Sequence, residues 1–67
     1  MIPDIDIHRS AWLMIRRYGE DAVVEAAVRG DELLDRGDLD GMLVWHAIIS
    51  AIRRLQATTP ASDEAVH

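Results

Sequence analysis

The apolar residues of this chain recur at helical spacing in three stretches, with a glycine between each stretch and the next. Plotted at roughly 100° per residue, the apolar positions of 5–18, 21–36 and 39–56 each gather on one side, which predicts three helices. Gly19 and Gly37 directly follow the first and second stretches. Glycine is the usual residue where a helix ends in a left-handed conformation, so we expect both to act as helix terminators.

The short connections at the two glycines predict how the helices are arranged. Helices joined so closely must fold back on one another, which gives an all-α fold. We expect a compact three-helix arrangement over residues 1–56, either up-down-up or a helical hairpin with the N-terminal helix laid across it. The remaining segment, 57–67, has no periodicity and contains a proline and small polar residues, so it is predicted to be a disordered tail.

The apolar faces of the second and third stretches differ in width. The face of 21–36 is expected to be centred on Val23, Ala27, Gly30 and Leu34, with Val24, Ala26 and Leu33 at its margins. The apolar residues of 39–56 follow the helical period and cover about half of the circumference, which is wider than an ordinary surface helix needs. They are Met42, Val44, Trp45, Ile48, Ile49, Ala51, Ile52 and Leu55.

The size of the chain indicates what its wide apolar face is for. A chain of 67 residues buries a small share of its surface, and one without cysteine has no disulfide to compensate. Association with another copy or with a partner protein is the remaining remedy, and tryptophan and methionine are favoured in such contacts. The interaction interface is therefore predicted at Trp12, Leu13, Met42, Leu43, Trp45, Ile49 and Ile52.

The net charge of −5 weighs against nucleic acid as a partner, because an acidic protein is repelled by phosphate backbones. All seven basic residues are arginines, and two adjacent pairs leave an alternative open. If the first and third helices run parallel, Arg16 and Arg17 would form one basic end with Arg53 and Arg54, suited to a small regulator that contacts nucleic acid or a ribonucleoprotein.

Asp31 is an unusual carboxylate, because the wheel places it at the flank of an apolar face. A buried carboxylate needs a hydrogen-bond donor, so we expect a structural buried polar residue paired with an indole, an arginine or a helix-end amide. The alternative is a small ligand or metal site that combines Asp31 with His46. His46 lies at the edge of its own apolar face, where histidine is commonly a border residue.

Neither catalytic residues nor a cofactor site can be assigned. The chain contains no phosphate-binding glycine loop, nucleophile elbow or HExxH motif. Asp38 to Gly41 has part of a calcium-loop pattern, but the ligand positions at its two ends would fall on Arg36 and Ala47, so we expect these carboxylates to cap the third helix. No uncharged run approaches the roughly 20 residues of a membrane span, and a cytoplasmic location is expected.

The run from Asp31 to Ile48, together with Trp12 and the Tyr18–Gly19 break, resembles a family of short, all-helical alphaproteobacterial proteins that have no assigned function. The resemblance covers roughly residues 8–55, nearly all of the predicted helical region. It implies a free-standing bacterial cytoplasmic helical protein and brings no active site with it.

Overall fold

The computed structural model describes residues 4–58, and within this range only residues 36–38 are not helical. The helices are α1 (Asp4–Tyr18), α2 (Ala22–Asp35) and α3 (Leu39–Thr58), and a 3-10 turn, η1 (Gly19–Asp21), joins the first two. The described residues contain no strand, so the predicted all-α fold class is confirmed.

Gly19 turns the chain without interrupting its helical structure. Helical residues run without a break from Asp4 to Asp35, so the described residues form two continuous helical stretches, of which the first contains α1, η1 and α2. The prediction of three separate helices is therefore wrong. Gly19 has a φ of +57°, which changes the direction of the chain as expected. The η1 turn follows at once and leads directly into α2, which leaves no room for a loop.

Gly37, by contrast, ends α2, and hydrogen bonds after it satisfy carbonyl groups of the last helical turn. Its φ is +81°, its amide donates to the carbonyl of Leu34 at 2.9 Å, and the amide of Asp38 donates to the carbonyl of Leu33 at 2.8 Å. This pair of bonds is the Schellman motif. Asp38 then caps α3, because its Oδ1 accepts from the amide of Gly41 at 2.9 Å. The predicted terminator and the predicted cap are both confirmed.

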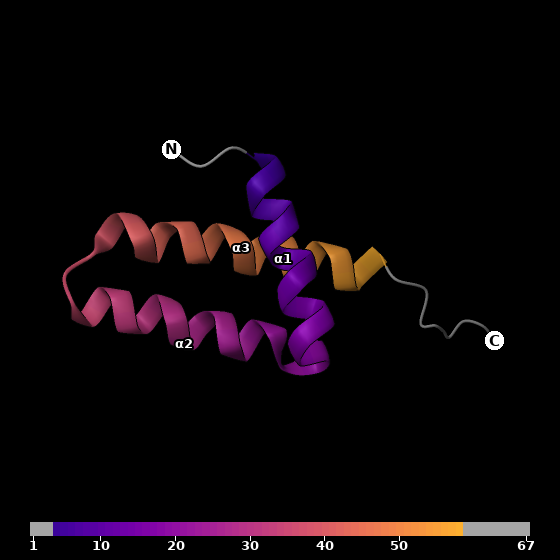
Figure 1. The fold of residues 1–67 in the computed structure, drawn as a ribbon, viewed down its shortest axis with the longest axis horizontal. Coiled ribbons are helices and arrows are strands. Elements are labelled where there is room, and N and C mark those ends of the chain that lie inside the picture. The colour runs from indigo at the N-terminus through magenta and orange to yellow at the C-terminus, as the bar shows by residue number, and fades with distance from the viewer. Residues whose placement is uncertain (1–3, 59–67) are drawn as a thin grey trace.

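The helices form a hairpin that is crossed by the N-terminal helix. Figure 1 shows α2 and α3 side by side, with α1 lying across α3 and reaching down to the start of α2. The largest interhelical interface is between α2 and α3, and α1 packs more extensively on α3 than on α2. Of the two predicted arrangements, the hairpin with a helix across it is therefore the one adopted.

The buried core is small and rich in alanine. Its hydrophobic members are Ile7, Ala11, Met14, Ala22, Ala26, Ile48, Ala51 and Ile52. Among the described residues, Ile52 is the largest side chain that is fully buried. On the α2 side of the hairpin the buried hydrophobic residues, Ala22 and Ala26, are small, which allows α3 to approach closely.

The face that α2 buries is rotated from the predicted one. Ala22, Ala26 and Gly30 are buried, whereas Leu34 is exposed and Ala27 is only partly buried. Sequence reasoning centred the face on the larger apolar side chains. The close approach of α3 instead selects the line of smallest residues.

The end of α3 also differs from prediction. The helix continues through Thr58, so residues 57 and 58 are helical and do not belong to the predicted disordered tail. The rest of that predicted tail, 59–67, lies outside the described residues.

Candidate interaction surfaces

Arg29 is the centre of a polar and aromatic cluster that joins all three helices. Its Nη2 donates to the hydroxyl of Tyr18, the last residue of α1, at 3.0 Å. Its guanidinium carbon lies 5.5 Å from the centroid of the Tyr18 ring and 5.8 Å from that of Trp45 on α3. These are distances at which a cation is attracted to an aromatic ring. The cluster ties the end of α1 to both helices of the hairpin.

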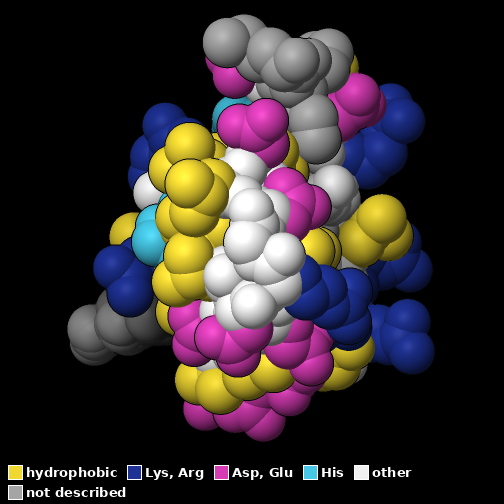
Figure 2. All heavy atoms as spheres, turned by 90° about the vertical axis from the view of Figure 1, so that its left-hand side faces the viewer, with side chains coloured by type: hydrophobic (Ala, Val, Ile, Leu, Met, Phe, Trp, Pro, Cys, Tyr) yellow, Lys and Arg dark blue, Asp and Glu magenta, His cyan; other side chains and the backbone are white. Residues whose placement is uncertain are grey.

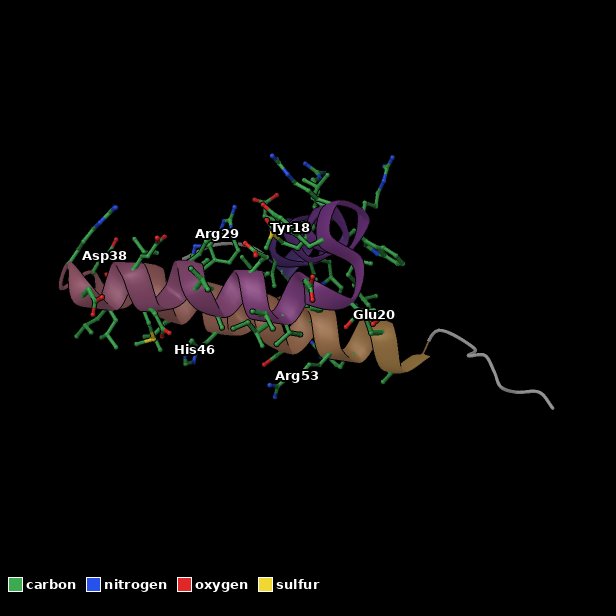
Figure 3. The ribbon with its side chains drawn as sticks, turned by 90° about the horizontal axis from the view of Figure 1, so that it is seen from below. Tyr18, Glu20, Arg29, Asp38, His46 and Arg53 are labelled. Atoms are coloured by element: carbon green, nitrogen blue, oxygen red, sulfur yellow. The ribbon has the colours of Figure 1, made fainter. Side chains whose placement is uncertain are left out.

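Two further features hold this cluster in place. Arg29 forms an ion pair with Glu25, one turn earlier, at 3.4 Å, as the spacing of these residues predicts. Gly30 lies against Trp45, since a Cβ built on this glycine would be 3.5 Å from the Trp45 Cβ. The hydrogen bond with Tyr18 raises the pKa of Arg29 further above its already high ordinary value, so the cation is permanent. Figure 3 shows Arg29 and Tyr18 close together.

The predicted interface residues divide into three groups. Ile52 is fully buried inside the protein, so its assignment to an association surface is wrong. Met42, Trp45 and Ile49 are partly buried, and Trp45 is engaged with Arg29 and Gly30. Trp12, Leu13 and Leu43 are exposed over 50%, 58% and 59% of their surface. The wide arc of α3 is largely used within the fold, because α1 and α2 both pack against it.

The outer side of α1 combines apolar and basic side chains, and we call Arg9, Trp12, Leu13 and Arg16 the basic face. All four are exposed, and they fall within an arc of roughly 100° on a helical wheel. Ile7, Ala11 and Met14 occupy the buried side of the same helix. The basic face is therefore turned away from the core.

The outer side of α2, with the preceding turn, combines apolar and acidic side chains, and we call Asp21, Val24, Val28, Asp31 and Asp35 the acidic face. All five are exposed, with Val24 at 59% and Val28 at 46%. They lie opposite Ala26 and Gly30, which face α3. Figure 2 shows acidic side chains around hydrophobic ones at the lower edge of the molecule, where α2 lies in Figure 1.

Asp31 belongs to this acidic face and is exposed, so the prediction of a structural buried carboxylate is wrong. The error follows from the rotated face of α2, because Val24 and Val28, which lie near Asp31 on the wheel, themselves face solvent.

His46 is also exposed, and it lies beside Gly30. Among residues 4–58, no group of three histidine or carboxylate side chains is placed to hold a metal ion. The predicted alternative site at Asp31 and His46 thus gains no support.

The four arginines of the predicted basic end are all exposed, but the condition for their grouping is not met. Helix α1 crosses α3 instead of running alongside it (Figure 1). In Figure 3, Arg53 points away from the side of α3 on which α1 lies. Arg17 is placed near Tyr18, with its guanidinium carbon 5.7 Å from the ring centroid.

A shallow depression lies where α1, η1 and α3 meet. It is lined by Ile15, Gly19, Glu20 and Gln56. The side-chain amide of Gln56 donates to the Gly19 carbonyl at 3.1 Å, which ties α3 to the turn between the other two helices. This bond gives Gln56 and Gly19 a structural role.

The chain matches no protein-family model, no curated protein and no solved structure. The resemblance to short alphaproteobacterial helical proteins therefore stays a prediction. No helix within residues 4–58 has both the length and the apolar character needed to cross a bilayer.

Proposed function

We propose that this protein is a non-enzymatic protein-interaction module of the cytoplasm, and that it binds its partner through the basic face of α1. The observation that carries the proposal is the exposure of Trp12 beside Leu13 on a helix side that points away from the core. Large apolar side chains in contact with water are stabilised when a partner covers them, and tryptophan and arginine are enriched at the centres of protein interfaces.

The predicted interface is thereby re-centred from α3 to α1. Ile52 and Trp45 pack inside the fold, whereas Trp12 and Leu13 each leave half or more of their surface exposed to a partner. Arg9 and Arg16 flank Trp12 at one-turn distances along the helix. A partner surface with apolar and acidic groups would fit both the ring and the flanking charges.

Site-specific photo-crosslinking in the native cells tests this proposal. A photoreactive phenylalanine analogue in place of Trp12 should give a discrete protein adduct. The same analogue at Ser50, which is exposed on α3 and lies outside both faces, should give none. Adducts at position 12 that contain only lipid or nucleic acid, or no adduct from a correctly folded protein, would refute the proposal.

A further inference from the structure

The basic and acidic faces have the same design with opposite charge. On α1, the apolar pair Trp12 and Leu13 lies between Arg9 and Arg16. On the acidic face, Val24 and Val28 lie between Asp21 and Asp31. We propose that the basic face of one copy of this chain docks on the acidic face of a second copy, an inference that rests on the proposed function and names its partner.

The two faces are of similar length. At 1.5 Å per residue, Arg9 and Arg16 are about 10 Å apart along α1, and Asp21, at the end of the η1 turn that leads into α2, is about 15 Å from Asp31. An apolar centre of one helix can therefore contact that of the other while the flanking charges reach across. Opposite charges placed in this way fix the orientation of the contact and disfavour other partners.

The charges of both faces are available for such a contact. Among residues 4–58, the ion pair between Arg29 and Glu25 includes no member of either face. Figure 2 shows basic and hydrophobic side chains together on its right-hand side, which is the side where α1 crosses the hairpin, and acidic ones at its lower edge. The two faces thus point in different directions, so each copy can offer one face while it receives the other.

The acidic face is what favours a second copy over other occupants. A phosphate backbone or an anionic lipid surface would fit the basic face alone, and the net charge of −5 opposes the approach of either. A second copy covers the apolar residues of both faces. It also brings a carboxylate to each arginine and an arginine to the acidic face. A polyanion would neutralise the arginines but leave the acidic face uncovered.

Sedimentation analysis of the full chain and of three charge-reversal variants tests the inference. Arg9→Glu/Arg16→Glu reverses the basic face, and Asp31→Arg/Asp35→Arg reverses the acidic face. Arg53→Glu/Arg54→Glu is the matched control, because it changes the net charge by the same amount as the first variant at exposed positions outside both faces. Circular dichroism verifies that each variant is folded.

The wild-type chain should associate at micromolar concentration, and each face variant should lower the association constant by roughly ten-fold or more. The control should stay within roughly two-fold of the wild type, because its charges lie outside the contact. An equimolar mixture of the two face variants should associate again, since their reversed faces complement one another.

Three results would overturn the inference: a wild-type monomer at every concentration, equal weakening by the control, or a mixture that fails to associate. A monomer whose position 12 still cross-links a different protein would overturn the inference and leave the proposed function intact. A monomer that binds anionic phospholipid vesicles through Trp12, without protein adducts, would overturn both.

Discussion

The guanidinium of Arg29 donates a hydrogen bond to the hydroxyl of Tyr18 at 3.0 Å, and the same cation lies 5.5 Å from the centroid of the Tyr18 ring. One residue of α2 therefore contacts both the polar and the aromatic part of the last residue of α1. Trp45 of α3 adds a second ring at 5.8 Å. This relationship fixes the position of the crossing helix on the hairpin.

Replacing Tyr18 with Phe should separate the hydrogen bond from the ring contact. The ring stays, and the loss of the hydroxyl should lower the free energy of unfolding by about 1 kcal/mol, the usual contribution of a partly exposed hydrogen bond. Urea unfolding followed by circular dichroism measures the change. In an Arg29→Met background the same substitution should have almost no effect. An equal loss in both backgrounds would contradict the assigned bond.

Gly37 allows a test of backbone conformation alone, because its φ is +81° and a Cβ built there meets nothing within 4 Å. The Cβ of an L-alanine would clash with no other part of the fold, but in the left-handed conformation it crowds its own backbone carbonyl, so Gly37→Ala should destabilise the fold by about 1–2 kcal/mol. A D-alanine, introduced by chemical synthesis, prefers positive φ and should stabilise it. Thermal unfolding of the three synthetic chains, with glycine, L-alanine or D-alanine at position 37, measures the effect. Equal melting temperatures for the two alanine chains would contradict the assigned left-handed conformation.

Gly30 should tolerate alanine, although it lies at the seam between α2 and α3. The built Cβ would meet the Trp45 Cβ at 3.5 Å and the His46 Cδ2 at 3.8 Å, which are ordinary contacts. Helix propensity then dominates, and Gly30→Ala should stabilise the protein by about 0.5–1 kcal/mol. Gly30→Leu should destabilise it by about 1–3 kcal/mol, since the larger side chain must push α3 away. Denaturant titration measures the free energy of unfolding of both variants. Destabilisation by Gly30→Ala would contradict the conclusion that a methyl group fits between α2 and α3 at this position.

Gly41 and Asp38 should be energetically coupled. A Cβ on Gly41 would meet the Asp38 Oδ2 at 2.8 Å, although Asp38 is the cap of α3. Asp38→Ala should destabilise the fold by about 1 kcal/mol through loss of the cap. Gly41→Ala should be more favourable in that background than in the wild type, because the clash with the carboxylate is gone and only that with the Leu33 Cδ1, at 2.9 Å, remains. A double-mutant cycle measures the coupling, and strictly additive effects would argue against it.

Two isoleucines provide a matched test of the core. Ile52 is fully buried, whereas Ile5 is exposed over 67% of its surface. Ile→Val removes the same methylene at either position, and it should reduce the free energy of unfolding by about 1 kcal/mol at Ile52. At Ile5 the change should stay within about 0.5 kcal/mol. Equal effects in chemical denaturation would mean that Ile52 does not form the centre of the core.

The parts of the fold that were predictable from sequence are those that depend on local chemistry. Gly37 and Asp38 each have a backbone or capping role that their residue type favours, and the structure places both as expected. The helical period of α3 also identified Ile48 and Ile52 as members of its apolar side. These signals need no knowledge of how the helices pack.

The parts that failed depend on which neighbour each helix meets. Leu34 was expected in the core and is exposed, because the contact with α3 follows Ala26 and Gly30 instead. Asp31 was misplaced by the same rotation. The contact of Arg29 with Trp45 arises only when α3 packs against α2, and its contact with Tyr18 arises only when α1 crosses the hairpin. The pattern of apolar and polar residues along each helix does not indicate which helix will cross it.

The alanine-rich core limits how the sequence can change. Ala11, Ala22, Ala26 and Ala51 are four of the eight buried hydrophobic residues, and each is completely inaccessible to solvent. Truncation has almost nothing to remove at these positions, so substitutions there can only enlarge the side chain. Each enlargement must widen the spacing of the helices. Over evolutionary time, we therefore expect the four alanines to be replaced less freely than the larger isoleucines, which can exchange with one another and with valine or leucine.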